Sequence, residues 1–302
     1  MERAFLELER RCAAAPHDAA SRRRMLQLFI ALGEPEALPG SSLAAPVRST
    51  SLRVAVVTPY CRESLAMLAR CHQSVLAQTV PCDHYMVADG YARDEIDRWS
   101  VRHIRLDAPC ADFGDTPRRV AGEIVREERY DAVAYLDADN AFRPRHVESL
   151  LVVHRMHGAP VCHAARTLHR TDGTLMPLLQ RGDNEDHVDT SCLLLTQDAF
   201  EMLRFWGSYP PALSAIDDRM FWSSIRGRGL HTAFSGALTC RYEASHEGFF
   251  AALREPAPPG TRPDVDLAAI GRWFATLAAA ERQRLDAHCR FPIENLIASL
   301  QA

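Results

Sequence analysis

The sequence contains no lysine, so all 35 of its basic residues are arginines. A Walker A P-loop needs a lysine on the nucleotide phosphates, and a protein kinase needs one on a strand. A pyridoxal-phosphate enzyme or a Schiff-base aldolase needs a lysine amine. The chain therefore belongs to none of these four classes of enzyme.

There is no surplus of positive charge either. The 302 residues include 39 acidic and 35 basic side chains, which gives a net charge of −4 at pH 7. A general nucleic-acid-binding protein normally carries a basic surplus, so we expect no nucleic-acid partner. Apolar residues make up 47% of the chain and charged residues 25%, which is ordinary for a globular protein.

The signatures of zinc ribbons, disulfide frameworks and membrane spans are also missing. The nine cysteines are scattered, odd in number and never spaced C-x-x-C. No apolar run is long enough to predict a transmembrane helix, and residues 1–5 lack the apolar stretch of a signal peptide. We therefore expect a cytoplasmic protein whose cysteines are mostly buried and reduced.

The first 52 residues are predicted to form a unit of their own. Apolar stripes at helical spacing, such as Phe5, Leu8 and Cys12, predict a helical hairpin over residues 1–34. Residues 35–52 are rich in Pro, Ser, Gly and Ala, which is the composition of a linker. A helical-repeat protein needs about three such hairpins, so we interpret the single copy as an N-terminal cap. The alternative is a module that binds a partner.

Strand and helix patterns alternate between residues 53 and 165. Short apolar runs predict strands, and longer amphipathic stretches between them predict helices. The predicted strands cover residues 54–57, 84–88, 101–106, 132–136 and 160–165, and the predicted helices cover residues 62–77, 116–129 and 144–157. This order is typical of an α/β protein with an open, mostly parallel sheet and helices on both faces.

The second half of the chain has a different pattern. We expect a long polar loop over 166–187, strands over 188–195 and within 231–242, helices over 197–206 and 217–226, and a loop over 254–263. Two C-terminal helices are predicted within residues 265–300. The predicted organisation is a main domain over 53–250, divided into halves at residue 150, followed by C-terminal helices over 264–302.

Polar residues follow three of the predicted strands. They are Thr58-Pro59-Tyr60, Asp89-Gly90 and Asp137-Ala138-Asp139-Asn140. Ligands of open α/β sheets bind beyond the carboxyl ends of the strands. Asp137 and Asp139 leave their strand on the same side and repel each other unless a cation lies between them, and carboxylate oxygens suit Mg²⁺ or Mn²⁺. We interpret the triplet as a metal site, with a solvated turn as the alternative.

Four ordered motifs resemble those of a known enzyme family. They are residues 54–60 (VAVVTPY) with Arg62 and Glu63, residues 74–79 (SVLAQT), residues 87–90 (VADG) and residues 134–140 (AYLDADN). Together they are similar to motifs of the family 2 glycosyltransferases, which have the GT-A fold and use nucleoside-diphosphate sugars. The resemblance covers residues 53 to about 150, a third of the chain.

The resemblance implies roles on the donor side. The residues implied in binding the nucleotide sugar are Thr58, Pro59, Tyr60, Glu63, Asp89, Arg118, Asp137 and Ala138. Asp89 would bond the base, commonly uracil, and Arg118 would face the diphosphate, with Arg119 as the less favoured neighbour. Asp139 would bind Mn²⁺ or Mg²⁺ directly, together with Asp137. The alternative for Arg118 is an exposed helical arginine.

The resemblance also implies an acceptor side in the second half. In the family an acidic pair, usually Glu-Asp, opens a helix below the acceptor, and its second member is the general base. Here the pair is Asp217-Asp218, and we favour Asp218 as the base, although helix capping by Asp217 is an equally ordinary use. His246 is similar to a late histidine that completes the metal shell, with a structural histidine as the alternative. Asp189 is a candidate for the border of the acceptor pocket, or a simple turn residue.

The implied reaction is sugar transfer from a nucleoside-diphosphate sugar, with UDP expected, to a hydroxyl of a glycan, lipid-linked or small-molecule acceptor. A carboxylate would take the hydroxyl proton, and direct displacement would invert the anomeric centre. The chain lacks the Gln-x-x-Arg-Trp signature of processive synthases, which favours single additions of the bacterial cell-surface type. Two alternatives stay open: a nucleotidyltransferase, and a catalytically degenerate transferase that binds partners.

Overall fold

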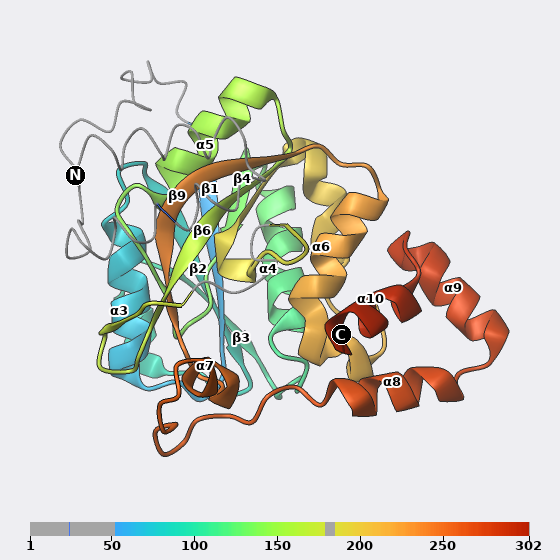
Figure 1. Ribbon diagram of the computed structural model, residues 1–302. Helices are drawn as coiled ribbons and strands as arrows, with labels where there is room; N and C mark the ends of the chain where they lie inside the picture. The colour runs from blue at the N-terminus through green and yellow to red at the C-terminus, as the bar shows by residue number, and fades with distance from the viewer. Residues whose placement is uncertain (1–23, 25–51, 179–184, 302) are drawn as a thin grey trace.

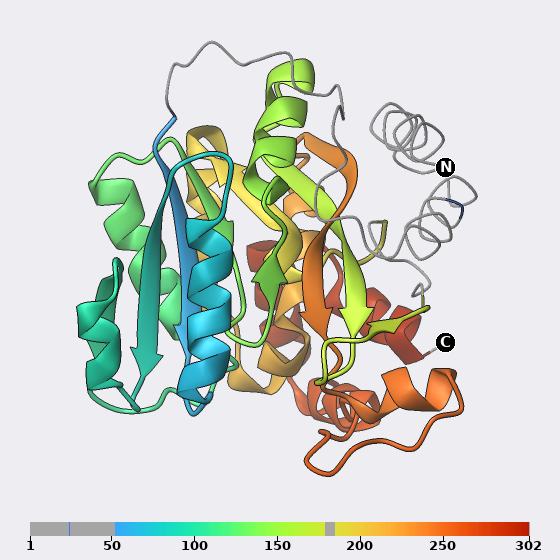
Figure 2. The same ribbon diagram turned by 90° about the vertical axis from the view of Figure 1, so that its left-hand side faces the viewer.

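The structure is a computed structural model that describes residues 24, 52–178 and 185–301 (Figure 1). The predicted helical hairpin over 1–34 and the linker over 35–52 lie almost wholly outside these residues, so both stay predictions. The described part of the chain forms one curved sheet with helices on both of its faces (Figures 1 and 2). The predicted α/β class is therefore confirmed.

The sheet contains nine strands within the described residues, and eight of them follow the spatial order β3-β2-β1-β4-β8-β6-β9-β5, with β7 paired to β6. The strands are β1 (Val54–Tyr60), β2 (Cys82–Asp89), β3 (Arg102–Leu106), β4 (Ala132–Tyr135), β5 (Ala141–Phe142), β6 (Val161–His169), β7 (Leu175–Met176), β8 (Leu193–Thr196) and β9 (Thr232–Glu243).

Most strands of the sheet run in one direction. Strands β1 to β4 are parallel, with Val54 opposite both Cys82 and Ala132. Strand β8 instead runs antiparallel to β4 and β6. A parallel connection needs a crossover, whereas the chain leaving β6 turns back at once to pair β7 with β6. Strand β6 is antiparallel to β8 and so runs in the direction of β4, and β9 is parallel to β6. The strands that reverse are β5, β7 and β8. The expected mostly parallel arrangement is therefore confirmed for the described residues.

The helices complete two layers around the sheet. Those in the first half are α3 (Leu65–Leu76), the 3-10 helix η1 (Asp94–Arg98), α4 (Asp115–Glu127) and α5 (His146–His157). Those in the second half are the 3-10 helices η2 (Thr190–Cys192), η3 (Gln197–Arg204) and η4 (Pro211–Ile216), then α6 (Asp217–Gly227), α7 (Glu247–Ala252), α8 (Leu267–Thr276), α9 (Ala279–Cys289) and α10 (Ile293–Gln301). The predicted helix over 197–206 is therefore a 3-10 helix followed by a turn.

Alternating side chains of β1 belong to two separate hydrophobic cores. Val54 and Val56 pack in a core that includes residues of α3 and α5. Ala55 and Val57 pack in a larger core with residues of α4, η3 and α6. Burial on both faces explains why β1 is continuously apolar rather than alternating. In Figure 2, α3 lies over one face of β1 and β2.

The C-terminal segment contains three helices where two were expected. The break between α9 and α10 falls at Arg290, which has a left-handed backbone (φ 66°), and Pro292 follows it. Buried side chains of these helices, such as Phe274 and Ile293, belong to the larger core. Within residues 52–178 and 185–301, no helix has the length and apolar character that crossing a membrane requires.

Candidate functional site

A cleft of about 380 Å³ lies where β1, β2 and β4 end. Its walls include eleven of the twelve residues that the sequence assigns to nucleotide-sugar binding, metal binding or catalysis: Pro59, Tyr60, Glu63, Asp89, Arg118, Asp137, Ala138, Asp139, Asp217, Asp218 and His246. These residues come from both halves of the main domain. The fold therefore brings the predicted donor-side and acceptor-side groups to one cavity.

Thr58 is the predicted residue that does not line the cleft. Its side chain is fully buried behind the cleft wall. The hydroxyl lies 2.9 Å from His84 Nε2 and 3.7 Å from Cys71 Sγ. Thr58 thus holds β1 against α3 and β2 instead of facing a ligand.

Polar contacts hold the wall of the cleft at the ends of β1 and β2. The Asp89 carboxylate accepts a 2.8 Å hydrogen bond from the backbone N–H of Cys110, and Glu63 accepts one of 2.6 Å from Cys61. The Tyr60 hydroxyl lies 2.7 Å from His103 Nε2, and burial raises the pKa of this tyrosine. Gly90 has a φ of 76°, and a Cβ there would lie 2.3 Å from the nitrogen of Pro109. Only glycine fits this turn, which keeps Asp89 at the end of β2.

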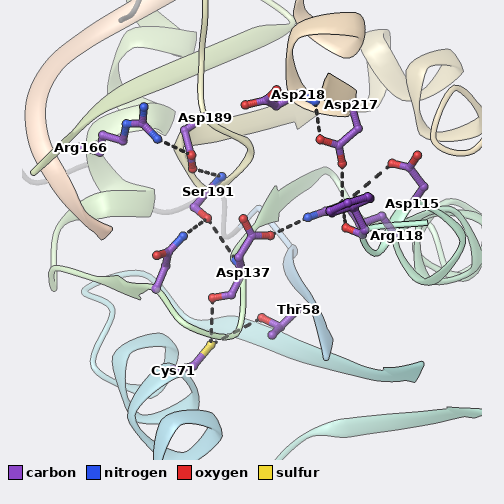
Figure 3. Close-up of polar contacts among 12 residues, drawn as sticks. Thr58, Cys71, Asp115, Arg118, Asp137, Arg166, Asp189, Ser191, Asp217 and Asp218 are labelled. Carbon is purple, nitrogen blue, oxygen red and sulfur yellow. Dashed lines mark hydrogen bonds and ion pairs between the residues drawn. The ribbon is translucent and has the colours of Figure 1, made fainter. Parts of the chain in front are cut away.

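Arg118 connects the two halves of the site (Figure 3). From helix α4 its guanidinium donates to Asp137 at 2.6 Å and to Asp217 at 3.2 Å. It also lies 5.1 Å from the centre of the Trp206 ring. Burial disfavours its charge, but Asp137, Asp217 and Asp115 together raise its pKa. The side chain is only 5% exposed, so the alternative of an exposed helical arginine is wrong.

Asp137 and Asp139 leave the end of β4 as a pair of negative charges. Burial, followed by the charge of Asp137, raises the pKa of Asp139 to about 7, and Glu243 and Glu63 act in the same direction. Carboxylates crowded in this way are stabilised by a divalent cation, for which their oxygens are suitable ligands. In the part of the chain that the structure describes, no three acidic, histidine or cysteine side chains gather closely enough to hold a metal alone. A cation bound here would therefore complete its shell with donor phosphates and water, as Mg²⁺ commonly does.

His246 lines the same cleft from the far end of the main domain. Its Nδ1 lies 3.1 Å from the carbonyl oxygen of Pro263. Because a carbonyl only accepts, Nδ1 must carry a proton, and in the neutral ring the lone pair is then on Nε2. This is the form that a histidine needs to bind a metal.

The two aspartates at the start of α6 lie in different environments, which shift their pKa values in opposite directions. Burial alone would raise the pKa of Asp218, but its ion pair with His187 and the charge of Arg219 lower the pKa below its usual range. Burial raises the pKa of Asp217 well above its usual range, against the opposing charge of Arg118. Asp217 accepts a hydrogen bond from the adjacent backbone N–H of Asp218, but α6 begins without a side-chain cap, so the alternative of helix capping by Asp217 is wrong. Asp218 is therefore the member that stays ionised, as a general base must.

Sequence reasoning missed several residues of the site. Arg262 lines the cleft from the segment expected to be a loop, where its backbone pairs with Ser245 and Glu247. Tyr242 at the end of β9 lines it too, with the buried Arg166 guanidinium 4.5 Å from its ring centre. Strand spacing gave no sign of either residue, because their places depend on how the second half folds back.

Asp189 is a turn residue that also lies in the wall of the cleft, whereas its place beside an acceptor stays a prediction. Its carboxylate caps the turn at η2 by accepting from the N–H of Ser191 at 2.9 Å, and it pairs with Arg166 at 2.6 Å. It also lines the cleft. The expected long loop over 166–187 is shorter than predicted, because β6 continues to His169 and β7 follows.

Comparison with known proteins yields structural likenesses only. No family model matches the chain, and no curated protein matches it in sequence. TarS of S. aureus, residues 1–349 in complex with UDP, is 13% identical, with a TM-score of 0.48 over 79% of this chain and 70% of that one. A longer TarS chain has the same identity and the same TM-score. The match covers 79% of this chain and 43% of that longer chain. The function must therefore be argued from the cleft itself.

Proposed function

We propose that the protein is a glycosyltransferase that moves a sugar from a nucleoside-diphosphate sugar to an acceptor hydroxyl. The observation that carries the proposal is the placing of three groups around one cleft. They are the Asp137–Asp139 pair after β4, the buried Arg118 and the ionised Asp218. Leaving-group stabilisation and proton removal need charges of this kind on the two sides of a reacting sugar.

The donor would lie along the ends of β1, β2 and β4. Asp89 and Tyr60 would contact the nucleoside, for which we favour uridine, and Glu63 supports the same wall. Asp137 and Asp139 would hold Mn²⁺ or Mg²⁺ together with donor phosphates and water, and the ion when bound would offset the negative charge of the departing diphosphate. His246 lies in the same cleft, but it does not form a three-residue metal site with the two aspartates in this arrangement. Arg118 adds a fixed positive charge beside Asp137 that costs no rearrangement during the reaction.

Asp218 would act as the general base. It would take the proton of the acceptor hydroxyl while that oxygen attacks the anomeric carbon and the bond from that carbon to the diphosphate oxygen breaks. Attack opposite to the leaving group inverts the configuration. His187 positions Asp218 through their ion pair, so that the carboxylate is ionised when the acceptor arrives.

The base assignment is tested with Asp218→Asn. We expect transfer to fall by about 10²–10⁴-fold, because amide nitrogen and oxygen cannot take the proton, while UDP binding stays intact. Asp198→Asn is the matched control, since Asp198 is exposed on η3, away from the cleft. Near-normal turnover of Asp218→Asn would contradict the assignment.

The donor side is tested by calorimetric titration of UDP with and without Mn²⁺. The wild-type protein should bind UDP more tightly with Mn²⁺, and Asp139→Ala should abolish that difference. A thermal-shift series of nucleotide sugars then identifies the donor, because a ligand that binds the native state raises its apparent stability. Equal UDP affinity with and without Mn²⁺ in the wild type would contradict the metal site.

A further inference from the structure

Phe113 is the most exposed large apolar side chain in the part of the chain that the structure describes, with an exposed fraction of 64%. The other large apolar side chains that are exposed there are Leu76, Tyr91 and Met156, and none of these three lines the cleft. Phe113 does line it. An aromatic ring in the wall of a cleft loses its contact with water only when a ligand covers it, and that burial favours binding.

The backbone that carries this ring is left-handed. Ala111 and Phe113 have φ of 55° and 56°, and Gly114 follows with 90°. Among the described residues, the other left-handed positions that are not glycine all follow the end of a helix, where this conformation is ordinary; they are Arg129, Arg254 and Arg290. The turn over 111–114 instead follows β3 and precedes α4. Helix termination therefore does not explain its strain, and strain of this kind gathers at ligand sites.

Contacts on both sides of Phe113 hold the turn in this form. The Asp112 carboxylate accepts hydrogen bonds from the N–H and the hydroxyl of Thr116, at 3.0 and 2.6 Å. The carbonyl oxygen of Phe113 accepts one from Arg118 Nη1 at 3.0 Å. A ligand that covers the ring therefore finds a backbone that is already ordered, which lowers the entropy cost of binding.

The turn lies along the wall where the nucleoside is proposed to bind. Before it, Cys110 donates its N–H to Asp89, at the end of β2, at 2.8 Å. At its other end, a Cβ at Gly114 would lie 3.0 Å from Cγ of Pro59, which is in β1. Phe113 falls between these two contacts, so its ring belongs to the part of the cleft at the ends of β1 and β2.

Two tyrosines line the cleft as well, but both are less exposed than Phe113. Tyr60 is 2% exposed, and its hydroxyl contacts His103 Nε2 and accepts from the backbone N–H of Arg93. Tyr242 lies near the end of β9, with the Arg166 guanidinium over its ring. Phe113 is therefore the ring that a ligand at the ends of β1 and β2 can cover.

We propose that Phe113 stacks on the nucleobase of the donor, an inference that rests on the proposed function. Nucleobases stack on aromatic side chains, and such stacking accepts any base because every base has a π face. Phe113 then strengthens the binding of different nucleotides alike, and the choice among bases falls to hydrogen bonds with Asp89. The two residues divide affinity and selectivity between them.

The test is calorimetric titration in the presence of Mg²⁺. The probes are UDP, CDP, ADP and GDP, with inorganic pyrophosphate as a diphosphate that has no base. Phe113→Ala should weaken the binding of each nucleotide that the wild type binds by about 5- to 150-fold, the contribution of one stacked base, and leave pyrophosphate binding unchanged. Phe113→Trp keeps a ring and should keep the affinity of the wild type. Met156→Ala is the matched control, because it removes an exposed apolar side chain of α5 that does not line the cleft.

Thermal denaturation of two variants checks that the turn is strained. Phe113→Gly and Phe113→Ala both remove the ring, but only alanine keeps a Cβ on the left-handed backbone. Phe113→Gly should therefore have the higher midpoint, although both variants should bind nucleotides more weakly than the wild type. A lower midpoint for Phe113→Gly would contradict the strain on which the proposal rests.

The outcomes also separate this proposal from the proposed function. A wild type that binds a nucleotide through Phe113 but neither hydrolyses nor transfers a sugar would contradict the glycosyltransferase and support the stacking. Nucleotide binding that Phe113→Ala leaves unchanged would overturn the stacking alone, and loss of transfer in that variant would then assign the ring to the acceptor. Equal weakening of nucleotide and pyrophosphate binding would overturn it too. A wild type that binds none of the four nucleotides would overturn both proposals.

Discussion

Arg118 holds together two carboxylates of the candidate site that come from distant segments of the chain. Its charge lies between Asp137, which follows β4, and Asp217, which opens α6. Both carboxylates are largely buried, with 27% and 14% of their side chains exposed. Without Arg118, the carboxylates of Asp137 and Asp217 would be partly buried and would each lose an ion-pair partner.

Arg118→Met should therefore destabilise the fold. We expect the free energy of unfolding to fall by about 3 kcal/mol, since removal of one member of a buried ion pair leaves the others uncompensated. Urea denaturation followed by circular dichroism measures the change. Arg119→Gln is the control on the next residue, which does not line the cleft, and a loss as large in that variant would refute the explanation.

Single residues of the site were predictable to the extent that they follow strands directly. Asp89, Asp137 and Asp139 stand at or just after the ends of apolar strands, and the carboxyl ends of parallel strands meet at one edge of the sheet. His187 could not be found in this way. Its pairing with Asp218 joins positions 31 residues apart through the fold of the second half, and a histidine in a polar stretch carries no pattern.

At the scale of elements, β1 is longer than the apolar run that predicts it. The strand was expected to stop at Val57, because Thr58-Pro59 follows, but it continues to Tyr60. Val57 is the last residue of β1 that pairs with β4, and its carbonyl oxygen accepts a hydrogen bond from the N–H of Leu136. Pro59 lies two residues after Val57, so its backbone nitrogen also points towards the β4 side of β1. Because β4 has already ended there, the missing N–H of Pro59 leaves no ladder hydrogen bond unmade.

The turn after β2 gives a prediction about one element. Gly90→Ala should cost more stability than Gly158→Ala, although both glycines have a left-handed backbone, with φ of 76° and 62°. A Cβ at Gly158 meets nothing within 4 Å, so that variant pays only the backbone cost of about 1–2 kcal/mol. At Gly90 the added carbon collides with Pro109, and Asp89 must shift.

Thermal denaturation and UDP titration of the two variants check this prediction. Gly90→Ala should have the lower midpoint and weaker UDP binding, whereas Gly158→Ala should keep the UDP affinity of the wild type. Equal effects of the two substitutions on UDP binding would show that the turn does not position Asp89.

At the scale of the whole molecule, buried neutral histidines make stability depend on pH. Burial lowers the pKa of His84 to about 3, and the neighbouring His72 acts in the same direction. Its ring nitrogens contact His72 and Thr58, each at 2.9 Å. Burial also lowers the pKa of His146 to about 3. An unfolded chain protonates these rings near pH 6.5, whereas the folded chain does so only near pH 3.

The free energy of unfolding should therefore be highest above pH 6.5 and fall as the pH decreases towards 3. Each of the two histidines contributes a slope of about 1.4 kcal/mol per pH unit within that window. His84→Gln should reduce the total slope by about that amount, as urea denaturation between pH 4 and 7 would show. His157→Gln, at the exposed end of α5, should leave the slope unchanged.

The overall organisation was predictable where local pattern decides it and unpredictable where packing does. The alternation of strands and helices in residues 53–165 follows from local periodicity, and so does the presence of C-terminal helices. The antiparallel entry of β8 and the return of Arg262 to the cleft depend on contacts between distant segments. Neither leaves a mark in the spacing of apolar residues.

The C-terminal helices support α6 from the side opposite its first turn. A Cβ at Gly227 would lie 2.2 Å from the carbonyl oxygen of Arg290, and Arg228 donates to the carbonyl oxygens of His288 and Cys289. No residue of α8, α9 or α10 lines the cleft. Under the proposed function, a random-mutagenesis screen for lost sugar transfer should nevertheless recover substitutions in α9, because a displaced α6 would carry its two aspartates away from the cleft.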